Sequence, residues 1–221
     1  MEEQESLQPL SESQKEALEE ATARYQSAVS VDVITYLDDR GISAPAMGMF
    51  RLGEVADPLP GHERYRGSVA IPYLDRKGGP LTIRFRCIKK HDHREFHHGK
   101  YASVPGDPPR MFNVGAIFRA KDEIHVTEGE FDAIVLNGIG LPAVAIPGSH
   151  LWQPRHRIML SGFNRIWVWG DPDDAGADMV NKITRALPRA RGVRLKDGDV
   201  SEMFLAGGAE ALLSLLPERS V

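Results

Sequence analysis

The sequence predicts an α/β protein with a mostly parallel sheet flanked by helices, preceded by a smaller mixed α/β subdomain. Two patterns predict this fold class. After Ala120, short apolar runs alternate with helical segments, which is typical of a doubly wound sheet. Before that, in residues 66–88, two strand-like runs flank a glycine-containing turn, which favours a β-hairpin. The chain has 221 residues, of which 42% are hydrophobic, so it can bury a core as two subdomains.

Two helices are expected at the start of the chain. Ser11 followed by Gln14 is a capping-box pattern, and apolar residues recur behind it at helical spacing. Residues 12–27 are therefore expected to form an exposed amphipathic helix. Ser30 can cap a second helix, and Gly41 is a natural end for it.

The expected hairpin is followed by a long stretch without regular periodicity. The hairpin strands are expected at residues 69–71 and 81–86, with the turn at residues 75–79. Residues 89–113 hold four of the eight histidines together with Gly and Pro. We expect an ordered loop or a short strand there.

The second half alternates between expected strands and helices. The strands are short apolar runs suited to a buried parallel sheet, at residues 124–126, 143–146, 165–169 and 192–195. The helices are expected at residues 130–138, 151–161, 174–187 and 208–216. The expected domain bounds are 1–28 for an N-terminal helical extension, 29–119 for the first subdomain and 120–221 for the sheet domain. In such a fold, functional residues lie where strands end and loops begin.

Acidic residues follow three of the expected strands. Glu128 follows the first strand, Asp171 and Asp173 the third, and the pair Asp197 and Asp199 the fourth. Because the carboxyl ends of parallel strands share one edge of a sheet, these side chains are expected to converge. Like charges repel, so such a cluster is stable when divalent cations neutralise it, and oxygen ligands favour Mg²⁺ or Mn²⁺.

The spacing of the acids extends this expected metal site. Asp132, four residues after Glu128, lies in the first turn of the next helix and can turn toward the same centre. Between Asp171 and Asp173, alternate side chains of an extended segment point the same way. The expected metal ligands are Glu128, Asp132, Asp171, Asp173 and Asp199. The expected catalytic residues are Glu128, Asp171 and Asp173.

Simpler roles compete for some of these acids. Asp and Glu are common at helix starts, where they cap the helix and favour its dipole. Asp132 could serve the helix dipole alone, and a plain turn accounts for Asp197 and Asp199 as well as a metal contact does. Asp174 is expected only to start the following helix.

The three acidic groups, in this order and on this strand pattern, resemble the Toprim domain shared by primases, topoisomerases and some nucleases. The resemblance covers residues 120–208, and the continuation Ala175 and Gly176 is typical of primases. It implies a Toprim-type sheet, bound divalent metal ions and chemistry on phosphodiester bonds.

The first half narrows the family. Motifs at residues 65–72, 78–79, 83–86 and 100–105 look like the subdomain that precedes Toprim in bacterial DnaG-type DNA primases. The resemblance implies that this half holds a single-stranded DNA template or nucleotide phosphates. The expected nucleic-acid or nucleotide contacts are Arg66, Arg84, Arg86, Lys100 and Tyr101. The function it implies is the synthesis of short RNA primers from nucleoside triphosphates (NTPs). The alternatives are a Toprim nuclease, or a non-catalytic replication accessory that binds single-stranded DNA or a helicase.

The sequence departs from the DnaG-type pattern at several points. Ser68 stands where a second arginine is usual, and Ser201 where a second acid is common, although Glu202 beside it can substitute. The zinc-binding and helicase-docking domains of the family are not recognisable. We therefore expect a phage or mobile-element form whose partners include a separate zinc-ribbon protein and a replicative helicase.

Charge is distributed unevenly along the chain. The formal net charge of −4 argues against a nonspecific binder of polyanions. Residues 84–100, however, carry six Arg or Lys, including Arg94, against two acids. This segment is the expected site of phosphate contacts.

The remaining features bear on zinc, location and membranes. A single cysteine, Cys87, excludes an internal disulfide framework and fits a reducing cytoplasm. The four histidines at positions 91, 93, 97 and 98 show no closed ligand set with cysteine, so a solvated basic loop is favoured over a zinc site and no zinc is expected. Without a leader or a long apolar stretch, a cytoplasmic protein with no membrane partner is expected.

Overall fold

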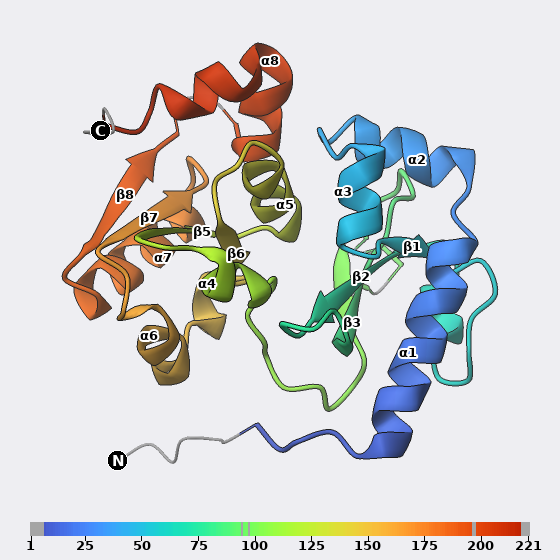
Figure 1. The fold of residues 1–221 in the computed structure, drawn as a ribbon. Helices are drawn as coiled ribbons and strands as arrows, with labels where there is room; N and C mark the ends of the chain where they lie inside the picture. The colour runs from blue at the N-terminus through green and yellow to red at the C-terminus, as the bar shows by residue number, and fades with distance from the viewer. Residues whose placement is uncertain (1–6, 94, 97, 196–197, 218–221) are drawn as a thin grey trace. The chain divides into compact units, whose positions relative to one another are not determined.

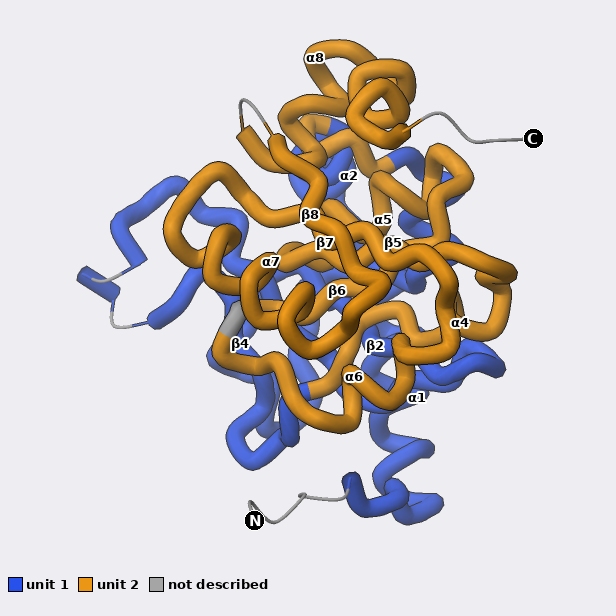
Figure 2. Tube along the Cα trace, turned by 90° about the vertical axis from the view of Figure 1, so that its left-hand side faces the viewer, with its two compact units in different colours: residues 1–38, 43–109 blue, residues 39–42, 110–221 orange. Residues whose placement is uncertain are grey.

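The structure is a computed structural model that describes residues 7–93, 95–96, 98–195 and 198–217. The chain divides into two compact units, coloured in Figure 2. Unit 1 comprises residues 1–38 and 43–109, and unit 2 comprises residues 39–42 and 110–221. Unit 1 contains an antiparallel sheet and unit 2 a parallel sheet flanked by helices, which confirms the predicted fold class (Figure 1).

Unit 1 is built on a four-stranded sheet in the order β1-β2-β3-β4. Its described elements are α1 (Glu12–Ser27), α2 (Val31–Asp38), α3 (Ala44–Met49), β1 (Gly53–Glu54), the 3-10 turn η1 (Glu63–Tyr65), β2 (Val69–Leu74), β3 (Pro80–Arg86) and β4 (Tyr101–Ser103). The short strand β4 is the regular element within the stretch 89–113, in agreement with the expected loop or short strand.

Helix α1 begins and packs as its sequence dictates. The Ser11 hydroxyl accepts the Gln14 backbone N–H at 3.2 Å, and the Gln14 side chain accepts the Ser11 N–H at 2.9 Å, which completes the expected capping box. Ala21 and Tyr25 are 1% exposed and pack in a core cluster with Phe85. Helix α1 is therefore part of unit 1 rather than a separate extension over residues 1–28, because one face buries apolar surface against the sheet.

Strands β2 and β3 form the predicted hairpin. The Asp75 carboxylate accepts the backbone N–H groups of Lys77 at 2.7 Å and Gly79 at 2.9 Å. Gly78 has φ +89, a left-handed conformation that favours glycine. The turn thus follows from local residues, as expected of Asp and Gly in a tight connection.

Unit 2 is built on a parallel four-stranded sheet in the order β6-β5-β7-β8. Its described elements are α4 (Gly115–Arg119), β5 (Glu123–Thr127), α5 (Glu130–Gly138), β6 (Ala143–Ala145), the 3-10 turn η2 (Ser149–Leu151), α6 (Pro154–Leu160), β7 (Arg165–Gly170), α7 (Asp174–Ala186), β8 (Ala190–Arg194) and α8 (Val200–Leu213). The four strands match the four predicted apolar runs to within a few residues.

Unit 2 begins before the expected bound at residue 120. Met111, Phe112 and Ala116 are at most 3% exposed and belong to its buried interior. Phe112 also bridges to the sheet, since its backbone N–H donates to the Ala145 carbonyl at 2.9 Å. Apolar burial and this backbone pairing place the start of the main segment of unit 2 at Arg110.

The last helix begins earlier than predicted. Helix α8 starts at Val200 instead of near residue 208, because Asp199 and Glu202 form a capping box at its N-terminus. At Gly208 the backbone leaves the helical region, with φ 64 and ψ −162. The predicted segment 208–216 thus corresponds to the part of α8 that follows this break.

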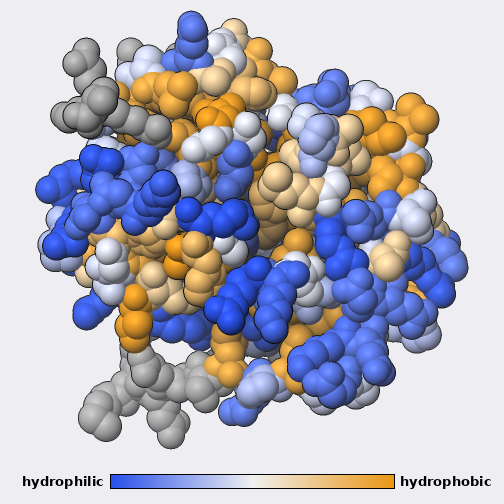
Figure 3. All heavy atoms as spheres, viewed as in Figure 1, coloured by the Kyte–Doolittle hydropathy of each residue, from blue (hydrophilic) through white to orange (hydrophobic). Residues whose placement is uncertain are grey.

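Hydrophilic and apolar residues are interspersed over the face drawn in Figure 3. In the part of the chain that the structure describes, no helix has the length and apolar character needed to span a bilayer.

Candidate metal centre and basic pocket

The topology of unit 2 places two acidic loops side by side. Strand β5 lies between β6 and β7, so the chain leaves β5 in one direction to reach β6 and later returns on the other side as β7. This is a topological switch point, where open α/β sheets form their sites. Thr127 pairs with Trp169 in parallel register, so Glu128 and Asp171 follow the ends of neighbouring strands.

Glu128 and Asp171 are half-buried and repelled by other carboxylates. Burial raises the pKa of Glu128, and the charges of Asp171 and Asp173 raise it further. Burial also raises the pKa of Asp171 to about 6, with added repulsion from Asp199, Asp173 and Glu202. Among the described residues, the charged groups that raise the pKa of these two acids are themselves acids. A hard divalent cation suits such a set of oxygen donors, so the residues present fit Mg²⁺ or Mn²⁺.

Asp132 is the most deeply buried acid of the cluster, at 7% exposed. Burial raises its pKa to about 8, and the charges of Asp199 and Asp171 act in the same direction. Its Oδ1 accepts the backbone N–H of Ser201 at 3.1 Å and the Ser201 hydroxyl at 3.0 Å, which holds the carboxyl group in place. Without a bound cation, this carboxyl group is protonated at neutral pH.

Gly129 makes room for this buried carboxyl group. A Cβ at Gly129 would lie 2.5 Å from Oδ2 of Asp132. A side chain at position 129 would therefore push the Asp132 carboxylate out of this position. The absence of a side chain at Gly129 is thus a requirement of the site geometry.

Asp173 and Asp199 serve as helix caps as well as members of the acidic cluster. Asp173 accepts the Gly176 N–H at 2.8 Å at the start of α7. Asp199 accepts the Glu202 N–H at 2.8 Å, and its other oxygen lies 3.6 Å from an Arg40 nitrogen. The capping role weighed for Asp173 is present, and Asp199 caps a helix where a plain turn was the alternative; the role of both as metal ligands stays a prediction. Asp197 lies outside the described residues.

Gly176 explains why glycine follows the acidic motif after β7. A Cβ at Gly176 would lie 2.3 Å from the carbonyl oxygen of Asp171 and 2.4 Å from its backbone nitrogen. The first turn of α7 therefore packs directly on the Asp171 backbone. This contact holds Asp171 beside the N-terminus of the helix.

Glu202 also belongs to the acidic cluster. The sequence suggested it only as a substitute for the acid that is common at position 201, where this chain has serine. Its charge contributes to the raised pKa of Asp171, and its Oε2 accepts the Asp199 N–H at 3.2 Å. The capping-box spacing of Asp199 and Glu202 is the signal that could have placed it here.

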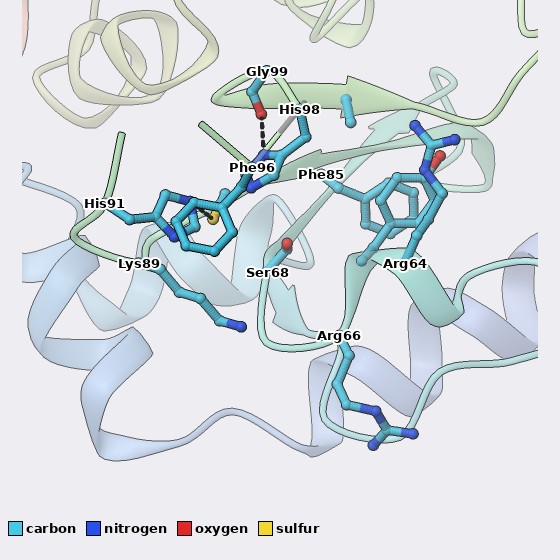
Figure 4. A pocket seen from close by; sticks show the side chains of 12 residues that line it. Arg64, Arg66, Ser68, Phe85, Lys89, His91, Phe96, His98 and Gly99 are labelled. Carbon is cyan, nitrogen blue, oxygen red and sulfur yellow. Dashed lines mark hydrogen bonds between the residues drawn. The ribbon is translucent and has the colours of Figure 1, made fainter. Parts of the chain in front are cut away.

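Unit 1 carries a basic pocket of about 770 Å³, shown in Figure 4. Basic side chains come to it from two segments: Arg64 and Arg66 from η1 and the residue after it, and Lys89 from the loop after β3. All three are exposed. The Arg66 guanidinium donates to the Ala56 carbonyl at 2.7 Å, which orients it. The lining residues are Arg64, Tyr65, Arg66, Ser68, Phe85, Cys87, Lys89, His91, Phe96, His98, Gly99 and Ala102.

The expected nucleic-acid contacts do not form one surface. Arg66 lines the pocket, as does Phe85, whose ring also packs in the core. Arg84 and Arg86 point to the opposite face of β3, because alternate residues of a strand face opposite ways. Their guanidinium groups lie 4.8 and 4.5 Å from the ring centre of Tyr101, in cation–π contact.

Arg86 differs from the expectation of an open phosphate contact. It is 4% exposed and donates to the Tyr36 hydroxyl at 2.5 Å, so it is a buried residue held between aromatic rings. Lys100 is exposed, and its role as a phosphate contact stays a prediction. Arg94, which was counted in the basic segment, lies outside the described residues.

Basic side chains lie near Ser68, the position at which DnaG-type primases usually carry a second arginine. Ser68 lines the pocket and is 8% exposed. The Lys89 Cε lies 3.9 Å from the position of a Cβ at Gly67, and Arg64 lines the same pocket. Sequence reasoning missed Arg64, because its role depends on the turn η1 that presents it.

The loop after β3 also brings cysteine and histidine together, contrary to the expectation drawn from their spacing. Ligand atoms of Cys87, His91, His93 and His98 all lie within 4.8 Å of one another. The spacing alone does not show this grouping, because it depends on how the loop between Cys87 and His98 folds back on itself. His97 lies outside the described residues.

Comparison with known proteins agrees with the fold and identifies a relative. No protein-family profile matches this sequence. The chain is 34% identical over 154 residues to the Gene 57 protein of Mycobacterium phage D29, covering 67% of this chain and 97% of that protein.

Solved structures of primases share the fold. The Aquifex aeolicus primase, solved with its zinc-binding and RNA polymerase domains, has a TM-score of 0.76 and 21% identity, covering 95% of this chain and 62% of that one. The RNA polymerase domain of Mycobacterium tuberculosis DnaG, in complex with a double-stranded DNA carrying a 6-nucleotide overhang, has a TM-score of 0.74 and 19% identity, covering 91% and 78%. This chain therefore belongs to the family of the Gene 57 protein of Mycobacterium phage D29, and its fold is that of DnaG-type primase catalytic cores.

Proposed function

We propose that this chain is the catalytic core of a DNA primase, which synthesises short RNA primers from NTPs on single-stranded DNA with Mg²⁺ or Mn²⁺. The observation that carries the proposal is the acidic cluster around Glu128 and Asp171 at the switch point of a DnaG-type fold. The likeness to solved primase structures supports the fold. The acidic cluster supports the proposed metal-dependent chemistry.

The position of each acid in the cluster suggests its role. Glu128 and Asp171, with Asp173, would hold the divalent ions, and Asp132 supports them from the buried side. Bound ions would neutralise the acids, lower the pKa of the attacking 3′-hydroxyl and offset the charge of the pyrophosphate leaving group. Glu128 would also accept the proton that leaves that hydroxyl.

The basic pocket would bind the phosphates of the template or of an NTP. Arg64, Arg66 and Lys89 are exposed donors in one cavity, and such contacts weaken with salt. The complex of M. tuberculosis DnaG with an overhanging DNA supports a partly single-stranded ligand for this fold. A separate zinc-ribbon protein and a replicative helicase are the protein partners we propose.

Nucleotide incorporation on single-stranded DNA tests the proposal. Asp171→Asn and Asp173→Asn should each lower labelled primer synthesis at least about 100-fold, because they remove a metal-binding charge worth several kcal/mol. Asparagine can still accept the Gly176 N–H at position 173, so the second variant separates charge from helix capping. Asp174→Asn is the matched control, since it changes an exposed acid of the same helix and should retain full synthesis.

The same reactions distinguish the rival functions. Shortened template strands would indicate a nuclease, and DNA binding without calorimetric Mg²⁺ binding would indicate a non-catalytic accessory. The assay is run with and without a zinc-ribbon protein from the same genome, so that a missing partner is not mistaken for inactivity. Full synthesis by Asp171→Asn would overturn the site assignment.

A further inference from the structure

Cys87, His91, His93 and His98 gather at one end of the hairpin formed by β3 and β4. The Cys87 sulfur lies 3.7 Å from Nε2 of His91, and that nitrogen lies 2.9 Å from Nδ1 of His93. The His98 ring centre is 4.9 Å from that of His91 and 5.1 Å from that of His93. Three imidazoles and one thiol therefore surround a common point.

The spacing of these atoms fits a tetrahedral zinc ion. Zn–S distances of about 2.3 Å and Zn–N distances of about 2.0–2.1 Å place two nitrogens about 3.4 Å apart and a nitrogen and a sulfur about 3.6 Å apart. The observed 2.9 and 3.7 Å lie within about 0.5 Å of these values, and all four ligand atoms lie within 4.8 Å of one another. Small rotations of the side chains would complete the geometry.

The surrounding backbone orients one of the rings. The Gly99 carbonyl accepts a hydrogen bond from Nδ1 of His98 at 3.0 Å. With the proton on Nδ1, Nε2 carries the lone pair that a metal requires. A backbone carbonyl that fixes the tautomer of a ligating histidine is a common supporting contact in zinc sites.

The loop between β3 and β4 is long for a hairpin connection. One backbone hydrogen bond closes its base, and another lies within it. The Cys87 N–H donates to the Lys100 carbonyl at 3.0 Å, and the His98 N–H donates to the His93 carbonyl at 3.0 Å. Hairpin loops commonly have roughly two to five residues, and longer irregular loops need another source of order. A metal ion held by four side chains of the loop would supply it.

From these observations we propose that Cys87, His91, His93 and His98 bind one structural Zn²⁺ ion. Four protein ligands leave no open position, which is the arrangement of structural zinc sites. The ion would displace the thiol proton of Cys87, and one thiolate with three neutral imidazoles leaves a net charge of about +1. This site replaces the sequence-based expectation of a solvated loop without zinc.

The zinc site would shape the basic pocket. His91, His98 and Phe96 lie on one side of the pocket in Figure 4, and Arg64 and Arg66 lie on the other. Phe96 is 60% exposed, and its ring stacks on that of His91 with centres 4.6 Å apart. A bound ion would hold this wall in place, together with Lys89 in the same loop.

Metal content of the purified full chain tests the proposal. Chain produced or refolded with Zn²⁺ should retain about one ion after gel filtration, measured by plasma mass spectrometry. Replacement by Co²⁺ should give the visible bands of tetrahedral cobalt and a near-ultraviolet thiolate band. Cys87→Ser should remove the thiolate band, and His93→Ala should weaken zinc binding at least about 100-fold.

Two controls locate the ion and separate this test from primer synthesis. His150→Ala changes an exposed histidine of unit 2, and Asp171→Asn changes the acidic cluster; both should retain zinc. Hydrogen exchange in residues 87–100 should slow on zinc binding in the unaltered chain, a readout independent of variant folding. Fewer than about 0.1 ions per chain, or full zinc content in both Cys87→Ser and His93→Ala, would overturn the proposal and leave the proposed primase activity untouched.

Discussion

The acidic cluster of unit 2 and the basic pocket of unit 1 handle charge in opposite ways. In unit 2, burial and mutual repulsion raise the pKa of Glu128, Asp132 and Asp171. In unit 1, Arg64, Arg66 and Lys89 are exposed around an open cavity. The acidic cluster holds negative charges that repel one another and that bound cations would neutralise. The basic pocket holds solvent-exposed positive charges that can contact phosphates. The formal net charge of −4 sums over the whole chain, so it does not reveal that the acidic cluster and the basic pocket lie in different units.

The two regions also differ in how their side chains are held. The acids are closely packed at two glycines: a Cβ at Gly129 would lie 2.5 Å from the Asp132 carboxylate, and a Cβ at Gly176 would lie 2.3 Å from the Asp171 backbone. The pocket has one wall in the irregular loop after β3. Adding a side chain at Gly176 should therefore cost stability, and substitutions in the pocket should mainly cost binding.

The largest effect is expected at Gly176. Gly176→Ala should lower the free energy of unfolding by about 3 kcal/mol, because the added methyl group overlaps the Asp171 backbone. Urea unfolding followed by circular dichroism measures it. Gly138→Ala in α5 is the matched control, since nothing lies within 4 Å of its Cβ position, and it should be neutral or slightly stabilising. Equal stability of both variants would show that the first turn of α7 does not pack as described.

A smaller effect is expected from neutralising Asp132. Its pKa is 3.8 in the unfolded chain and about 8 when folded, so the folded state holds the proton more tightly. The resulting stability is complete below about pH 4 and is lost as the pH rises toward 8. Asp132→Asn keeps an acceptor for Ser201 and removes the charge. Without divalent cations, it should raise the free energy of unfolding at pH 8 by on the order of 2 kcal/mol.

Thermal unfolding in chelator between pH 5 and pH 8.5 checks this expectation. The melting temperature of Asp132→Asn should fall less with rising pH than that of the unaltered chain. Asp174→Asn, an exposed acid of the same unit, should show the slope of the unaltered chain. Parallel curves for all three proteins would contradict the raised pKa of Asp132.

The smallest effect is expected for single cations of the pocket. Lys89→Ala should weaken binding of a single-stranded oligonucleotide about threefold to tenfold, and lower the salt slope by about 0.7, the value for one phosphate contact. Fluorescence anisotropy at several salt concentrations measures both quantities. Lys77→Ala, an exposed lysine of the β2–β3 turn, should change neither. A matching loss in both variants would indicate diffuse attraction rather than a binding pocket.

Local sequence was sufficient for the elements and their order. The Ser11 capping box, the Asp75–Gly79 turn and the four apolar runs of the parallel sheet depend on residues close together in the chain. The order of strands and acids also indicated that Glu128 and Asp171 would lie at one edge. Their roles as ligands stay predictions, although burial first, and then the charge of neighbouring acids, raises the pKa of each.

Contacts between distant segments could not be derived in this way. Asp132 is held by Ser201, 69 residues away, and Arg86 is buried against Tyr36, 50 residues away. Arg84 and Arg86 are basic in the sequence, but the pairing of β3 with β4 directs them onto Tyr101 instead of into the pocket.

Periodicity, capping motifs and glycine positions were enough for the α/β class and for the acids at the strand ends, because these follow from interactions within a few residues. The depth of burial of Asp132 and the division of the basic residues between two faces were decided by contacts between distant segments. The grouping of Cys87 with three histidines was decided by the fold of one irregular loop, which has no periodic pattern to predict it. Burial and through-space distance set the pKa of an acid and the geometry of a metal site, and neither follows from the spacing of residues along the chain.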